Sequence, residues 1–267
     1  MATRRDFVQS VFAAALPAAL PIRPALRNDG LERILEATSV IGNRTPEDVA
    51  ADEDYIQRAA PIGIYPQGYY PHNVHSLMVS AQMAGDGATV IESANKLERV
   101  VQDAAARNIA WVQPIKAAPY FAHAQFSDTK TILALADPGA EFPYVQAMWR
   151  YARGVGLAAA GDMAAAQGEV EAIAKLEQTA DFANLTAGGV PAKEVLQVAQ
   201  HVVNARIAQA NKDLPGAIAH FETAAKVADT LSYNEPPYWY YPIRQSLGAV
   251  QTLAGELDKA EQTFRAS

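Results

Sequence analysis

The stretch that decides the fold runs from residue 247 to residue 264 and reads LGAVQTLAGELDKAEQTF. Gly248 is followed twelve positions later by Ala260 and four positions after that by Phe264, with a Gly255-Glu256 turn between them. This spacing suits two antiparallel helices whose backbones cross where only a hydrogen or a methyl group fits, with a bulky side chain filling the space one turn later. The stretch therefore predicts a helix hairpin.

The same offsets recur upstream, so the hairpin is a repeating unit. The three clear sets are Gly154, Ala166 and Val170; Ala205, Ala217 and Phe221; and Gly248, Ala260 and Phe264, with a degenerate set at Met78, Val90 and Ala94. No stretch alternates polar and apolar residues over the length of a strand. We therefore expect an all-α fold, an α-solenoid of helix hairpins, with one repeat domain over residues 26–267 and its clearest repeats over 143–267.

The middle of the chain is less regular than either end. Residues 88–107 are expected to form a single helix, the partner of a helix over residues 70–84. Pro114 and Pro119 are then expected to interrupt the helical pattern, because an internal proline removes a backbone hydrogen bond. A short helix is expected over residues 129–135.

The composition excludes some classes of function. The formal net charge is −7, and the 22 basic residues are scattered along the chain, which argues against nucleic acid as a partner. The chain has no cysteine, so it has neither disulfides nor thiolate metal sites. It also lacks a nucleophile elbow, a Walker loop and a glycine-rich dinucleotide motif. We therefore expect no cofactor and no catalytic activity.

The first 25 residues differ from the rest. Arg4-Arg5 precedes a short apolar run from Val11 to Leu20, which is the layout of an export signal of the twin-arginine type. The alternative is an N-terminal helix that packs on the first repeat. The first interpretation predicts a periplasmic or exported protein and the second a cytoplasmic one. The run is too short to span a membrane.

Leu247-Gly248 together with Ala260-x-x-x-Phe264 resembles the consensus of the tetratricopeptide (TPR) repeat. The repeat alanines lie 51 and 43 residues apart, whereas the consensus period is 34, so these repeats have longer helices or loops. Residues 63–75, 151–154 and 235–242 are similar to segments of a group of bacterial TPR proteins of poorly defined activity. The resemblance implies a scaffold that binds a protein or peptide, and it implies no catalytic residues.

On the TPR register, the first helix of each hairpin lines a concave face that is the candidate partner-binding groove. The residues expected there are His72, His75, Gln82, Tyr151, Arg206, Gln209 and Gln245. Aromatic residues beside prolines are either packing between repeats or anchors for a bound peptide. These candidate anchors are Tyr70, Tyr238, Trp239 and Tyr241.

His72 and His75 support the alternative function, an exported metal-binding or hydrolytic protein, because histidines three apart on a helix share one face. A third protein ligand is missing, since His123, His201 and His220 are scattered in the sequence. Packing or groove lining is therefore the simpler interpretation of the pair, and no metal site is assigned.

The last helix ends almost directly after Phe264. We expect Val250, Leu253, Leu257 and Phe264 to lack a downstream helix that would cover them. This predicts that the C-terminal helix pair associates with a second copy of the chain or with a partner, or that the chain is a fragment of a longer array.

Overall fold

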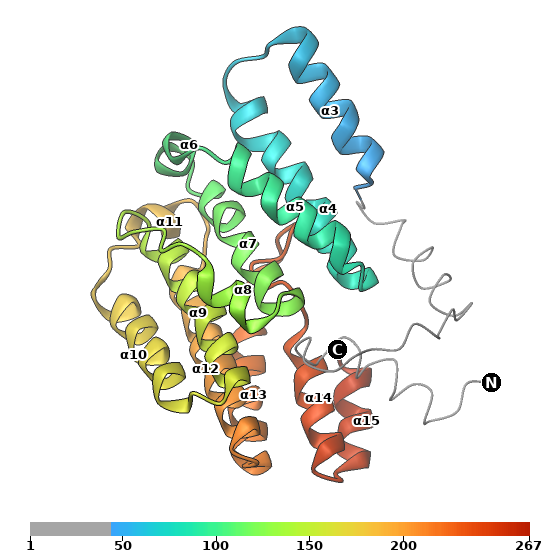
Figure 1. Ribbon diagram of the computed structural model, residues 1–267, viewed down its shortest axis with the longest axis vertical. Helices are drawn as coiled ribbons and strands as arrows, with labels where there is room; N and C mark the ends of the chain where they lie inside the picture. Colours follow the sequence, from blue (N-terminus) through green and yellow to red (C-terminus); the bar gives the residue numbers. More distant parts are fainter. Residues whose placement is uncertain (1–43) are drawn as a thin grey trace, which may run out of the picture.

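A computed structural model describes residues 44–267, which form an all-α solenoid of helix hairpins (Figure 1). This part of the chain contains thirteen α-helices, one π-helical turn and no strand. The elements are α3 (Pro46–Ala59), η1 (Tyr65–Tyr69), α4 (Tyr70–Ala84), α5 (Gly87–Val100), α6 (Asp103–Asn108), α7 (Val112–Phe126), α8 (Thr129–Ala134), α9 (Pro143–Ala160), α10 (Met163–Thr179), α11 (Ala183–Ala187), α12 (Ala192–Ala210), α13 (Leu214–Ala228), α14 (Ile243–Leu253) and α15 (Leu257–Arg265). The proposed leader, residues 1–25, and the start of the expected repeat domain, residues 26–43, lie outside the described residues.

Four hairpins make up most of the molecule: α4 with α5, α9 with α10, α12 with α13, and α14 with α15. Successive hairpins stack, because α12 packs against both α9 and α10 of the preceding pair. The last pair is attached differently, since α14 packs mainly against α13. Between the first two hairpins, α7 packs against α5 on one side and α9 on the other, which continues the stack.

The four hairpin turns share one backbone geometry. In each turn the residue just before the N-cap of the second helix is in the left-handed region, with φ between 61° and 84°. The next residue donates its backbone N–H to the carbonyl five positions earlier, at 2.9–3.0 Å, which satisfies a carbonyl at the helix end. That next residue is acidic each time and is the N-cap of the second helix: Asp86, Asp162, Asp213 and Glu256. The repeat in the sequence is thus a repeat in the structure.

The small residues of the repeat lie at close helix crossings. A methyl group added at Gly248 would come within 2.7 Å of the Phe264 ring, as the spacing predicts. At Gly154 the closest neighbour is a residue of the next hairpin, because an added methyl would lie 2.9 Å from a methyl of Val203 on α12. Gly154 therefore sets the distance between two hairpins as well as the distance within its own.

The structure corrects two expectations about the middle region. Residues 88–107 are two helices, α5 and α6, with a break at Val101-Gln102. The prolines do not interrupt the chain, since α7 runs through both of them. Pro114 lies in the first turn, where its missing N–H has no partner to lose. Pro119 lies inside the helix and is buried, so packing against α5 and α9 offsets its lost hydrogen bond. The short helix α8 is confirmed.

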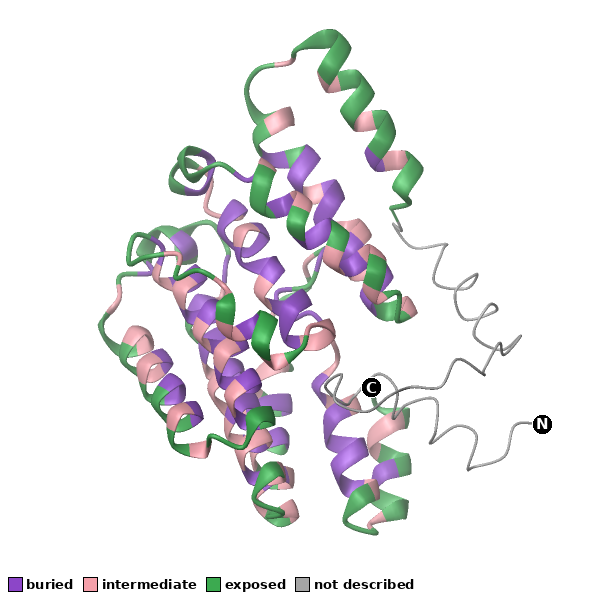
Figure 2. Ribbon diagram, viewed as in Figure 1, coloured by how far each residue is buried: buried purple, intermediate pink, exposed green. Residues whose placement is uncertain are grey.

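The helix α3 stands apart from the core. Val49 is its only buried residue, and Figure 2 shows most of the helix as exposed. Polar contacts hold it instead: Asp52 accepts hydrogen bonds from Tyr65 and Asn73, each at 2.7 Å. Glu53 accepts a hydrogen bond from the Tyr70 hydroxyl and forms an ion pair with Lys96 on α5.

No helix in residues 44–267 is long and apolar enough to cross a membrane.

Candidate functional site

Arg206 on α12 is a half-buried cation that neighbouring side chains hold in place. Its two terminal nitrogens donate to Gln209 Oε1 at 2.9 Å and to Ser246 Oγ at 3.2 Å. The guanidinium also lies over the ring of Phe221, 5.2 Å from the ring centroid. Among the described residues no carboxylate lies within ion-pair distance of it, and its other N–H donors have no protein acceptor. A carboxylate from another molecule would complete its hydrogen bonding.

Polar and aromatic groups from α14 and the segment before it surround Arg206. Ser246 Oγ, which accepts from Arg206, donates in turn to the Tyr241 hydroxyl at 3.1 Å. Gln245, the neighbour of Ser246, is half-buried, as are Gln209 and Tyr241. Helices α12 and α14 thus share a partly exposed polar surface with a fixed positive charge at its centre. We call Arg206, Gln209, Tyr241 and Gln245 the Arg206 surface.

The segment of residues 233–242, between α13 and α14, is the aromatic connector. Figure 1 shows it, in red, running alongside α7. Tyr240 stacks on Phe121 of α7 with ring centroids 4.6 Å apart, and Trp239 packs edge-on against the same ring at 5.3 Å. Tyr151 of α9 completes the cluster, with its hydroxyl 2.7 Å from that of Tyr240. The connector therefore ties two distant helices to the start of α14.

Tyr151 is fully covered by this cluster, with 1% of its surface exposed. Burial and the neighbouring tyrosines raise the pKa of Tyr151, and burial also raises that of Tyr240, so both remain neutral phenols. In this structure the chain's own aromatic connector occupies the surface at Tyr151 that the sequence places in a groove.

The groove residues on α4 lie apart from Arg206 and are more buried than a groove requires. His75 and Gln82 are each 5% exposed, and Gln82 Nε2 donates to Gln125 on α7 at 3.2 Å. His72 is half-buried. Burial lowers the pKa of His75 to about 3, so the ring is neutral, and its Nδ1 has no hydrogen-bond partner among residues 44–267. Among the predicted groove residues, Arg206 and Gln209 contact each other, and Gln245 precedes Ser246, the residue of α14 that accepts from Arg206.

The four candidate aromatic anchors all have packing contacts within the chain. Tyr70 and Tyr238 donate their hydroxyls to Glu53 and to the Gly189 carbonyl, at 2.7 and 3.0 Å. Trp239 is buried in the aromatic cluster, while Tyr241 is half-buried beside Arg206. More exposed aromatic rings are Tyr55, Tyr69 and Tyr233, which sequence reasoning did not select and which no sequence pattern distinguishes from the rest.

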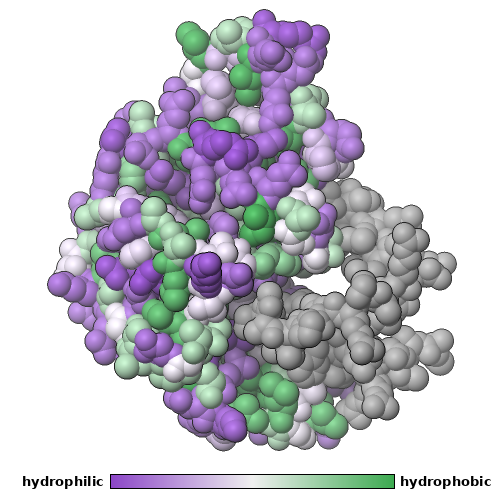
Figure 3. Space-filling model, viewed as in Figure 1, coloured by the Kyte–Doolittle hydropathy of each residue, from purple (hydrophilic) through white to green (hydrophobic). Residues whose placement is uncertain are grey.

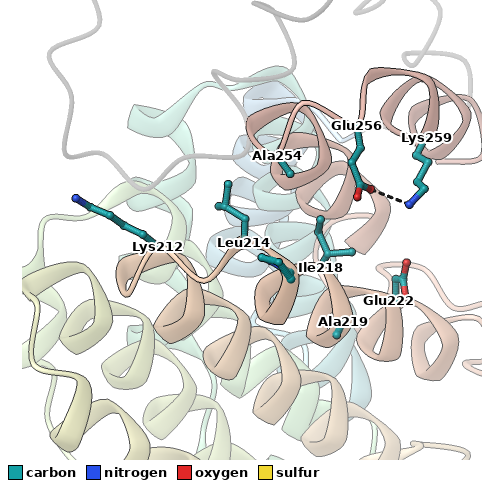
Figure 4. Close-up of a pocket in the computed structure, with 9 residues that line it drawn as sticks. Lys212, Leu214, Ile218, Ala219, Glu222, Ala254, Glu256 and Lys259 are labelled. Atoms are coloured by element: carbon teal, nitrogen blue, oxygen red, sulfur yellow. Dashed lines mark ion pairs between the residues drawn. The ribbon is translucent and has the colours of Figure 1, made fainter.

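A surface pocket of about 510 Å³ lies between the start of α13 and the α14–α15 turn (Figure 4). Its apolar lining includes Leu214, Pro215, Ile218 and Ala254, and its charged residues are Lys212, Glu222, Glu256 and Lys259. Figure 4 shows the ion pair between Glu256 and Lys259 at its edge. Next to this turn, Leu253 and Leu257 are 50% and 48% exposed, and Figure 3 shows apolar surface at this end of the molecule. Val250, which was expected to be uncovered, is buried.

The structure brings together two histidines that the sequence separates. His201 on α12 and His220 on α13 face each other with their Nδ1 atoms 3.3 Å apart. His72 and His75 show no comparable pairing in the described part of the chain. Among residues 44–267 no group of three or more His, Cys, Asp or Glu side chains is arranged to hold a metal ion.

The Arg206 surface is the candidate functional site, because it combines a positioned charge with partly exposed polar and aromatic groups. Comparison with known proteins identifies no family for this chain. No protein-family model, no curated protein and no solved structure matches it.

Proposed function

We propose that this protein is a non-catalytic scaffold of the TPR kind that binds a peptide segment of a partner protein through the Arg206 surface. The observation that carries the proposal is that the Arg206 guanidinium is held in one orientation while part of its hydrogen-bonding capacity is unused in the described part of the chain. Its guanidinium is held by Gln209 and Ser246 and has N–H donors that no other residue within 44–267 accepts. A cation that is already oriented loses little conformational entropy on binding, so it can recognise a carboxylate with geometric specificity.

The surroundings of Arg206 suit a peptide better than a small anion. Tyr241 offers an aromatic face beside the charge, and Gln209 and Gln245 offer amide groups that can pair with a peptide backbone. Aromatic and arginine side chains are also the types that carry most of the binding energy in protein interfaces. The expected ligand is an extended segment with an acidic side chain or a terminal carboxylate.

The C-terminal end is the second part of the proposal, as a contact with another copy of the chain. Leu253 and Leu257 are half exposed beside a pocket whose lysines and glutamates could pair with those of a second copy. Light scattering over a dilution series tests this part, since a mass that stays monomeric at high concentration excludes it.

The test of the main proposal begins with partner capture on the immobilised wild-type protein from an extract of its source cells. Overlapping peptides of the captured partner are then titrated against wild type, Arg206→Gln and Arg58→Gln. Arg58 is an exposed arginine on α3 with an acidic partner one turn away, so its replacement removes the same charge elsewhere. We expect Arg206→Gln to weaken binding by roughly tenfold or more, about 1.4 kcal/mol, and Arg58→Gln to leave it unchanged. Equal affinities for all three proteins would contradict the proposal.

A further inference from the structure

His201 and His220 lie on the two helices of one hairpin, and their ring nitrogens approach closely. The Nδ1 atoms are 3.3 Å apart, while the ring centroids are 5.6 Å apart, so the nitrogens are the parts of the rings that face each other. Both side chains are half-buried, which leaves the pair accessible from solvent. Without a bound ion, the Nδ1–H of one ring donates to the other Nδ1.

The spacing between these nitrogens also suits two ligands of one metal ion. Zinc binds histidine nitrogen at about 2.0–2.1 Å, and two nitrogens at a tetrahedral angle are then about 3.3 Å apart. The helices α12 and α13 already hold the nitrogens at this separation. Metal binding requires both Nδ1 lone pairs to point at one ion, so the proton between the two nitrogens must leave and the imidazole rings must turn about their side-chain torsions.

The surroundings of the pair favour a cation. Glu177 on α10 is held by two amides of α12, with Gln197 Nε2 and Gln200 Nε2 each donating at 2.7 Å. Gln197 lies one helical turn before His201, so the carboxylate is fixed near the pair. Burial and the neighbouring His220 lower the pKa of His201, against the opposing effect of Glu177. Neutral imidazole is the state that binds a metal ion.

We propose that His201 and His220 form a two-histidine site for a late first-row divalent cation such as Zn²⁺ or Cu²⁺. The chain supplies two ligands, as it would at His72 and His75, but here the two nitrogens already lie 3.3 Å apart. Water or a side chain of a bound partner fills the remaining positions. Imidazole nitrogen suits these ions, and copper is expected to bind more tightly than zinc. An ion here joins α12 to α13 and so braces the hairpin that carries Arg206. The site uses none of the residues of the Arg206 surface and does not depend on the proposed function.

Zinc titration of the full chain by calorimetry at neutral pH tests the site, with His201→Gln and His220→Gln as variants. The matched control is His72→Gln, another half-buried histidine on a helix. We expect one zinc ion per chain for wild type and for His72→Gln, and affinity at least about tenfold weaker for each of the other two variants. Failure of wild type to bind zinc, or unchanged affinity in the His201 and His220 variants, would overturn the proposal. Loss of binding in His72→Gln alone would move the site to α4 and overturn it as well.

A measurement on wild type alone guards against variants that fold poorly. Nuclear magnetic resonance of the histidine rings is recorded as zinc is added. The ring signals of His201 and His220 are expected to shift together at one equivalent, while those of His123, whose Nδ1 contacts Ser127, stay in place. Shifts spread evenly over all the histidine rings would show non-specific binding and contradict the site.

Discussion

Replacing Gly154 by alanine tests whether this position sets the distance between two hairpins. In an ordinary helix interior Gly→Ala is stabilising by about 0.5–1 kcal/mol, because alanine has less backbone freedom to lose. At Gly154 the new methyl would lie 2.9 and 3.1 Å from the two methyl groups of Val203. Val203 is fully buried and β-branched, so it has few ways to move aside. Overpacking of this kind costs about 1–3 kcal/mol.

Gly168 provides the matched control, since it also lies inside a helix, α10, and an added methyl there meets no atom within 4 Å. The gain in helix propensity is common to both variants and cancels in the comparison. Gly154→Ala should therefore be less stable than Gly168→Ala by the overpacking cost, about 1–3 kcal/mol. Urea unfolding followed by far-ultraviolet circular dichroism measures both free energies of unfolding.

A double-mutant cycle identifies Val203 as the cause. Val203→Ala alone should destabilise the protein by leaving a cavity, and in the Gly154→Ala background it should cost less, with a coupling energy of about 0.5–3 kcal/mol. If Gly154→Ala is as stable as Gly168→Ala and shows no coupling to position 203, this would contradict the claim that α9 and α12 cross closely at Gly154 and Val203.

Three further predictions concern other parts of the chain. Because the pKa of His75 is lowered in the folded protein, only the unfolded state binds a proton at this residue between about pH 6.5 and 3. The free energy of unfolding should therefore fall by up to about 5 kcal/mol as pH drops through that range. His75→Phe should flatten this part of the stability profile measured by urea unfolding, and an unchanged slope would count against the buried neutral ring. The hydrogen bond from Lys96 is the largest cause lowering the pKa of Glu53, so this contact stabilises the folded protein above the ordinary pKa of Glu53, near 4.5. The stabilisation is lost as pH falls through the lower pKa that Glu53 has in the folded protein. Glu53→Gln should speed proteolysis between α3 and α4 at neutral pH without moving the main unfolding transition, and equal cleavage rates would show that the ion pair does not hold α3. If residues 1–25 are an export signal, Arg4→Lys with Arg5→Lys should retain the protein in the cytoplasm, whereas a full-mass wild-type chain already in the cytoplasm would refute export.

The hairpins could be predicted because their signals are local. Gly161-Asp162 contains both a residue suited to the left-handed conformation and an acidic N-cap, and the structure uses both. The path of α7 through Pro119 could not be predicted in this way. Whether an internal proline is tolerated depends on packing against α5 and α9, which lie elsewhere in the sequence.

The same distinction between local and distant contacts explains the candidate site. The register placed Arg206, Gln209 and Gln245 on the first helices of their hairpins, as the structure has them, but Tyr151 is covered by a connector almost ninety residues away. That contact depends on how the aromatic connector folds back, and no helical period encodes it.

A signal for the histidine pair was present in the sequence. Ala205 and Ala217 are equivalent positions on the two helices of one hairpin. His201 lies four residues before the first and His220 three after the second, so an antiparallel pair of helices brings them level.

Site-specific photo-crosslinking in the source cells tests the central claim most directly. A photo-reactive amino acid replaces Gln245, which precedes the Arg206 partner Ser246 on α14, and in a second variant it replaces the exposed Gln178 on α10. We expect a crosslinked partner protein from position 245 and none from position 178. The crosslink should disappear when Arg206→Gln is added, because the anchoring charge is lost. No crosslink at position 245, or a crosslink that persists without Arg206, would contradict partner binding through this surface.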